Sequence, residues 1–229
     1  MISIKRNSER GHSQYGWLDS WHTFSFGEYY DPANKGVSVL RVINDDTVQP
    51  NSGFETHAHR DMEIISYIRE GTIEHRDSMG HVTRLEAGDV QVMTAGTGVV
   101  HSEFNPSATE PLRFLQIWIR PDQKGLGPGY RQFKFPRING RQTIVSPDGI
   151  NGSLRINQDT TIERVRLAAD DEITFEVDGE RSAYLHMVSG EMNLNDILMR
   201  AGDGAAISVA SVRLHGRGED AEALLLSLS

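Results

Sequence analysis

The chain has 229 residues, no cysteine and a formal charge of −9 at pH 7. This charge argues against nucleic-acid binding, which needs clustered Lys and Arg on the phosphates. No apolar run approaches the roughly 18 residues of a membrane span, and residues 1–16 lack the apolar core of a secretory signal. We therefore expect a cytoplasmic protein that binds neither nucleic acid nor membrane, and the sequence leaves its oligomeric state open.

Short stretches rich in Val, Ile and aromatic residues recur along the chain between Gly, Asp, Asn and Pro. Such stretches are typical of strands, and few segments have a helical period. The pattern predicts an all-β protein. We expect strands near residues 37–43, 63–69, 72–77, 90–94, 112–119, 153–158, 162–167, 181–189, 205–209 and 223–227.

A faint repeat divides the chain. A strand ends in a Gly turn at Gly71 and again at Gly190, and an Ala-Gly-Asp loop follows each turn. The repeat predicts two β-barrel domains, residues 1–135 and 136–229, joined through the Gly- and Pro-rich stretch that begins at Pro121. The simpler alternative is that Ala-Gly-Asp is only a common turn.

The first candidate site is the pair His57 and His59. Residues i and i+2 of a strand point to the same face, so both imidazoles can turn into a barrel and reach one ion. Alone, a His-x-His pair is a weak signal.

A second pair strengthens it, because His101 and Glu103 repeat the same spacing after the Gly-rich segment 93–98. The 42 positions between His59 and His101 leave room for a hairpin near 70–84 that returns the chain alongside. Three nitrogens and one oxygen suit iron, nickel, manganese, copper, cobalt or zinc. The absence of cysteine also leaves imidazole and carboxylate as the strong ligands.

Other titratable residues rank lower. Glu63 could be a fifth ligand, but we expect it to support the site or to form a salt bridge. His75 and His81 flank an expected hairpin tip and are interpreted as solvated turn residues.

The remaining imidazoles are expected to have structural roles. His12 and His22 belong to an aromatic segment that we expect to pack against the barrel, with a place on a pocket wall as the alternative. His186 and His215 are isolated, so no metal site is expected in the second domain.

Several motifs together resemble the pirin family of the cupin superfamily. They are GFETHAHRDME (53–63), MTAGTGVVHSE (93–103), GWLDSWHTFSF (16–26), SPDG (146–149) and INQD (156–159). The resemblance covers almost the whole chain and is strongest to the bacterial pirin-like quercetin dioxygenases. It implies a bicupin with two jelly-roll barrels, of which only the N-terminal one binds metal.

The resemblance also implies the chemistry. One divalent ion, with iron as the first expectation, would be held by residues matching His57, His59, His101 and Glu103. The flavonol ring would be opened by molecular oxygen with release of carbon monoxide, and Glu103 would accept the proton of the flavonol hydroxyl. One departure is Asn157, where relatives often carry His; we expect it to affect only contacts in the second domain.

Two other functions are alternatives. Mammalian pirins, which the chain also resembles, are metal-dependent regulators that bind transcription factors, but the negative charge makes this reading less attractive. A sugar isomerase or epimerase on a cupin barrel ranks last, because it would share the ligand types but not the pirin-like segments.

Overall fold

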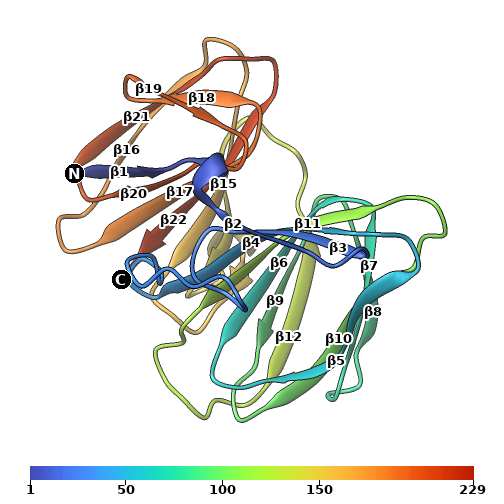
Figure 1. Ribbon diagram of the computed structural model, residues 1–229. Helices are drawn as coiled ribbons and strands as arrows, with labels where there is room; N and C mark the ends of the chain where they lie inside the picture. Colours follow the sequence, from blue (N-terminus) through green and yellow to red (C-terminus); the bar gives the residue numbers. More distant parts are fainter. The chain divides into compact units, whose positions relative to one another are not determined.

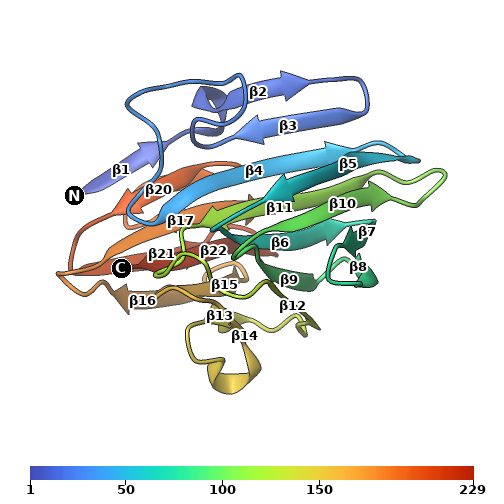
Figure 2. The same ribbon diagram turned by 90° about the horizontal axis from the view of Figure 1, so that it is seen from below.

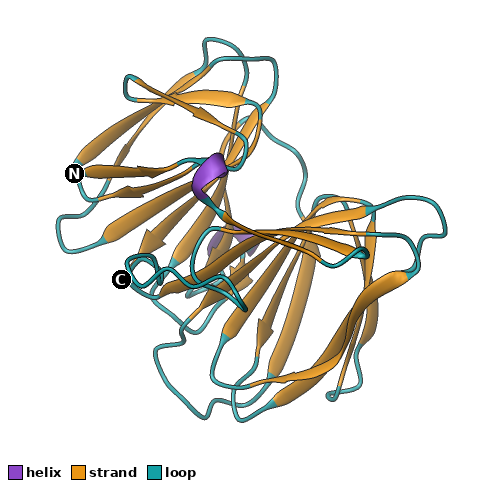
Figure 3. Cartoon of the chain, viewed as in Figure 1, coloured by secondary structure: helices purple, strands orange, loops and turns teal.

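The computed structural model describes residues 1–229, and it consists almost entirely of strands (Figure 3). It contains 22 strands and two short 3-10 helices, η1 (Asn7–Glu9) and η2 (Ile150–Gly152). The predicted all-β class is therefore confirmed. No helix is long and apolar enough to cross a bilayer.

The chain divides into two compact units (Figure 1). The first barrel comprises Gly11–Pro136 and Leu154–Gln158; the second barrel comprises Met1–Arg10, Arg137–Ser153 and Asp159–Ser229. This division differs from a single cut after residue 135, because each unit includes a short segment that is remote in sequence.

Strand pairing explains why Met1–Arg10 belongs to the second barrel. Strand β1 (Ile2–Lys5) pairs antiparallel with β20 (Gly204–Ile207), so it covers the edge of a sheet in the second barrel. An uncovered sheet edge exposes unpaired backbone groups, and β1 satisfies them. Local sequence patterns do not reveal a partner about 200 residues away.

Two antiparallel sheets form the first barrel. One has the order β12-β9-β6-β11-β4-β3-β2 and the other has the order β5-β10-β7-β8. Figure 2 shows β2 and β3 as a hairpin beside β4 at the end of the larger sheet. Their bounds are β2 Gly11–Gln14, β3 Leu18–His22, β4 Leu40–Val48, β5 Ser52–His59, β6 Glu63–Glu70, β7 Thr72–Asp77, β8 Val82–Glu86, β9 Asp89–Thr94, β10 Val99–Asn105, β11 Leu112–Ile119 and β12 Gly129–Lys134.

The core of the first barrel lies between these sheets. One buried cluster joins Leu18, Ile68 and Phe114 of the larger sheet to Ile73 and Leu85 of the smaller one. Sheets that share a core pack face to face, as in a jelly roll.

The second barrel has the same two-layer build. Strands β1, β20, β17, β22, β15 and β13 lie side by side in that order, and β16-β21-β18-β19 form the other sheet. A single large cluster of buried aliphatic residues draws on both sheets, including Leu185 and Leu214. The remaining bounds are β13 Gly140–Ser146, β14 Leu154–Arg155 (in the first barrel), β15 Thr161–Leu167, β16 Glu172–Glu176, β17 Ser182–Ser189, β18 Glu191–Leu194, β19 Ile197–Arg200, β21 Ser211–Gly216 and β22 Ala221–Leu228.

Corresponding glycines join the two sheets in each barrel, Gly71 between β6 and β7 and Gly190 between β17 and β18. Gly71 has φ 76° and Gly190 has φ 69°, both in the left-handed region that favours glycine. A Cβ at Gly71 would lie 2.6 Å from the carbonyl oxygen of Pro111, and one at Gly190 would lie 2.8 Å from Cα of Ala221. These matched turns are consistent with the repeat seen in the sequence.

The predicted strand at 153–158 is largely wrong. Only Leu154–Arg155 forms a strand there, and Asn157 and Gln158 use their side chains as donors. Gln158 Nε2 donates to the carbonyl of Arg120, and Asn157 Nδ2 donates to Glu63. Side-chain bonding to the first barrel therefore replaces a strand ladder.

Candidate metal centre

The structure brings His57, His59 and His101 together on one wall of the first barrel. His57 and His59 lie on β5, and His101 lies opposite His57 on β10. Their ring centroids are 4.5 to 4.9 Å apart, and Nε2 of His57 lies 3.1 Å from Nε2 of His101. Antiparallel pairing of two strands thus unites residues that are distant in the chain.

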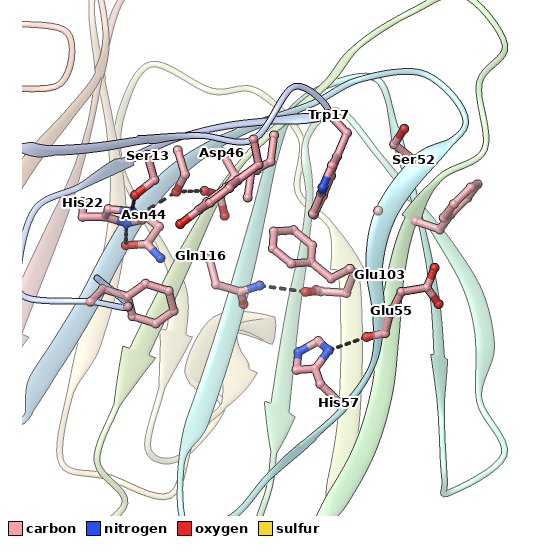
Figure 4. Close-up of a pocket in the computed structure, with 18 of the residues that line it drawn as sticks. Ser13, Trp17, His22, Asn44, Asp46, Ser52, Glu55, His57, Glu103 and Gln116 are labelled. Atoms are coloured by element: carbon pink, nitrogen blue, oxygen red, sulfur yellow. Dashed lines mark hydrogen bonds between the residues drawn. The ribbon is translucent and has the colours of Figure 1, made fainter. Parts of the chain in front are cut away.

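A β-bulge re-aims the side chain that follows. His101 pairs with His57, but Glu103 pairs with Phe54, so β5 contains one extra residue between these pairs. Glu103 is buried, and its carboxylate accepts a bond from Ser66 Oγ at 3.2 Å. It accepts a second bond from Gln116 Nε2 at 2.8 Å (Figure 4). Both bonds hold the carboxylate in one orientation.

Two sets of donor atoms result, and they share His101. The atoms of His57, His59 and His101 all lie within 4.8 Å of one another, as do those of His75, His101 and Glu103. Glu103 therefore lies close to His101, which in turn lies close to His57 and His59.

The donor set fits a divalent ion. Nδ1 of His57 lies 2.7 Å from the carbonyl of Glu55, so it carries the proton and leaves the Nε2 lone pair directed at His101. Two nitrogens bound to one ion at about 2.1 Å and a right angle would lie about 3 Å apart, close to the spacing between these two Nε2 atoms.

The imidazoles of His59 and His101 are also neutral at physiological pH. Burial, followed by the neighbouring imidazoles, lowers the pKa of His59 to about 4 and that of His101 to about 3. Both therefore keep a lone pair available, as a metal ligand must.

His75 was expected to be a solvated turn residue, and this prediction is wrong. It is fully buried and lies opposite Glu103 in the β7–β10 register. Its Nε2 bonds Asp77 at 3.0 Å, its Nδ1 is buried without a partner, and its ring centroid is 5.3 Å from that of His101. His81, by contrast, is 39% exposed and bonds Asp77 from the turn.

The period of the strand could have revealed His75. Ile73, His75 and Asp77 alternate with Glu74 and Arg76 along β7, and residues two apart point to the same face. A buried Ile73 therefore indicates that His75 also points inward.

We expect His75→Ala to lower divalent-ion affinity about 10- to 100-fold, the usual effect of removing a group that orients a ligand. The His75 ring packs against the His101 ring, with the centroids 5.3 Å apart, and so restricts the orientation of His101. Competition with a chromogenic chelator would measure the affinity. His12→Ala is the matched control, and equal affinity in the His75 variant and the wild type would contradict this role.

Glu63 belongs to neither donor set. It is fully buried on β6 and accepts bonds from Thr94 Oγ1 at 3.1 Å and Asn157 Nδ2 at 3.2 Å. The sequence placed Asn157 in the second domain, and the structure corrects this, because Leu154–Gln158 belongs to the first barrel. Glu63 and Asn157 together attach that segment to the barrel.

We expect Glu63→Gln to gain stability relative to the wild type as the pH rises from about 4 to 8. Burial raises the pKa of Glu63, although its hydrogen bonds oppose this. A raised native pKa contributes stability below the unfolded value of about 4.3, and this contribution is lost as pH rises through the native pKa. Melting temperatures across this range would test it, with exposed Glu110→Gln as control; a difference independent of pH would contradict it.

A cavity of about 880 Å³ opens beside the imidazoles within the first barrel. His57, His59 and Glu103 contribute to its wall, and Figure 4 shows His57 and Glu103 near one end. Aromatic side chains supply much of the rest: Tyr15, Trp17, Phe26, Phe54, Phe104 and Trp118. The cavity therefore suits a flat, mainly apolar ligand.

The aromatic N-terminal segment divides between the two roles considered for it. His22 lies on the cavity wall, which was the alternative expectation. His12 instead stacks on Trp21 at 4.1 Å and bonds Asp19 at 3.1 Å. Side chains alternate along β3, so His22 points inward to the cavity. Trp21 points outward, where His12 stacks on it.

Comparison with known proteins agrees with this architecture. The family model described as Pirin matches residues 4–119, and that of the quercetinase C-terminal cupin domain matches 143–228. Quercetin 2,3-dioxygenase of Escherichia coli strain K12 is 45% identical over 100% of this chain and 99% of its own length. A pirin-like protein of Caulobacter vibrioides is 39% identical over 99% of each chain.

A solved structure carries a metal. The bacterial pirin YhhW from Escherichia coli, crystallised in complex with nickel(II), superposes with a TM-score of 0.97 at 44% identity. The match covers 100% of this chain and 99% of that one. The predicted architecture of two cupin barrels is thereby confirmed.

Proposed function

This chain belongs to the pirin family, and we propose that it is a metal-dependent dioxygenase that opens the heterocyclic ring of flavonols such as quercetin with molecular oxygen. One observation supports the proposal: His57, His59 and Glu103 line an aromatic cavity, and His101 lies within 4.8 Å of the other donor atoms in each of the two sets. The full-length similarity to a quercetin 2,3-dioxygenase supports the same reaction.

His57, His59, His101 and Glu103 would hold the ion. A bound divalent ion would polarise the flavonol hydroxyl and lower its pKa. Iron is our first choice, and nickel, manganese, cobalt, copper and zinc suit the same donors. The nickel complex of the related YhhW supports a first-row metal here.

Glu103 would take the proton of the flavonol hydroxyl. Its carboxylate is fixed by Ser66 and Gln116, so it needs no reorganisation before accepting a proton. The released electron density of the enolate is what makes the ring reactive toward oxygen.

Aromatic side chains would orient the ring and exclude water. The rings of Trp118 and His59 meet edge to face with their centroids 5.0 Å apart, and the ring centroids of Phe54 and Trp17 are 5.1 Å apart. A dry wall of this kind strengthens the electrostatic contacts of the reacting groups.

Oxygen uptake with quercetin by freshly metallated protein tests the proposal. We expect one molecule of oxygen consumed for each molecule of carbon monoxide released, with activity proportional to bound metal across the reconstituted ions. Metal-free protein is the control. If no reconstituted ion supports oxygen consumption while quercetin is bound, the dioxygenase assignment is wrong.

A further inference from the structure

The cavity has a second polar end, formed by Ser13, Ser20, His22, Asn44 and Asp46. Figure 4 shows Ser13, His22, Asn44 and Asp46 gathered there, and His57 with Glu103 at the other end. None of the five belongs to either donor set near the candidate metal centre.

Hydrogen bonds hold this polar end in a defined arrangement. Nδ1 of His22 donates to Oδ1 of Asn44 at 2.9 Å, because an amide oxygen only accepts. Nε2 of His22 then accepts from Ser13 Oγ at 3.0 Å, and Ser20 Oγ donates to Asp46. The orientations are therefore set before any ligand arrives.

The burial of two of these polar side chains, Asn44 and Asp46, carries an energetic cost. Asn44 and Asp46 are each 3% exposed, yet both line the cavity. Placing an amide and a carboxylate on a largely aromatic wall costs desolvation energy that an apolar residue would avoid. A ligand that hydrogen-bonds them would recover part of that cost.

The charges on the cavity wall restrict which kinds of ligand can bind. Four carboxylates line the cavity, those of Glu28, Asp46, Glu55 and Glu103, and no Lys or Arg does. Away from the metal centre an organic anion would meet carboxylates with no Lys or Arg to offset them, whereas a neutral hydroxyl can donate to a carboxylate in a strong, charge-assisted bond. The wall therefore favours neutral hydroxyl donors.

Gln116 lies between the two ends (Figure 4). Its Nε2 donates to Glu103, and its buried Oε1 has no partner. A ligand that extends from Glu103 toward Asp46 thus passes a further open acceptor.

We propose that Ser13, His22, Asn44 and Asp46 form a subsite for hydroxyl groups on a ring remote from the metal, so that the protein selects neutral polyhydroxylated aromatic enols. The subsite rests on the proposed function for the position of the enol. It predicts discrimination against aromatic acids and against enols without remote hydroxyls.

Ligand binding to the metal-loaded protein tests this directly. Quercetin and 3-hydroxyflavone share the enol and keto groups, but only quercetin has hydroxyls on its outer rings. Quenching of tryptophan fluorescence should show that the wild type binds quercetin at least about 10-fold more tightly, the effect of one hydrogen bond to a charged group.

Asp46→Ala should reduce that ratio to near 1, mainly by weakening quercetin binding. Thr47→Ala on the same strand is the matched control, because Thr47 does not line the cavity. Asp46→Asn keeps the shape and removes the charge. It should strengthen binding of a 3-hydroxyflavone that carries a carboxylate on its phenyl ring, which tests the subsite even if the Ala variant fails to fold.

The outcomes separate the two proposals. A wild-type ratio near 1, or an unchanged ratio in Asp46→Ala, overturns the subsite even if quercetin is turned over. Hydroxyl-dependent binding without oxygen consumption supports the subsite and overturns only the dioxygenase assignment.

Discussion

Replacing His101 by Ala is expected to lower divalent-ion affinity by at least about 100-fold, more than the loss of a group that only orients a ligand. His101 is the one imidazole common to both sets of donor atoms, and it is 2% exposed. Its removal therefore takes one donor atom from both sets. Metal content after reconstitution and competition titration would measure the loss.

Thermal unfolding gives an independent measurement of the same change. An ion present at 100 times its dissociation constant stabilises a protein by about 2.7 kcal/mol, and a 100-fold weaker site gains only about 0.4 kcal/mol. The metal-dependent rise in melting temperature should therefore nearly vanish in His101→Ala. His215→Ala, in the second barrel, should keep it; a full rise in the His101 variant would refute the proposed ligand.

Glu103→Gln is expected to lower turnover per bound metal about 10²- to 10⁴-fold, the usual contribution of a general base. The amide oxygen can still accept from Gln116 Nε2, and the amide nitrogen can donate to Ser66 Oγ, so the local structure should persist. The amide cannot accept a proton from the flavonol hydroxyl. Part of the metal should remain, because the three imidazoles are unchanged.

The measurement is oxygen uptake normalised to metal content, so that weaker metal binding is not mistaken for slower chemistry. Glu110→Gln removes an exposed carboxylate and should behave as the wild type. Full activity per metal in Glu103→Gln would leave Glu103 as a ligand or structural residue and require another base.

Local patterns predicted much of the fold. Strands β7 and β11 were predicted with their observed ends, because each follows a clear turn signal and is rich in residues that favour strands. Several edge strands were missed, among them β2 and β12, since polar residues on an exposed face give no hydrophobic signal.

The sequence likewise predicted part of the candidate site and missed the rest. The i, i+2 spacing placed His57 beside His59, and the spacing of the two pairs allowed His101 to return alongside them. His75 was wrongly predicted to be solvated, because it lies close to a hairpin tip in the sequence although the period of β7 turns it inward. The polar end of the cavity was not predicted, because its residues come together only when three strands pair: Ser13 lies on β2, His22 on β3, and Asn44 and Asp46 on β4.

By itself, the sequence determined the all-β class, the turn glycines and the same-face pairs of metal-binding type, since each depends on neighbours a few residues apart. Only the tertiary structure decided that Met1–Arg10 joins the second barrel, that Leu154–Gln158 joins the first, and that His75 lies beside His101. The physical reason is that strand pairing across a sheet and packing between sheets join residues of any separation, and such contacts leave no local periodicity.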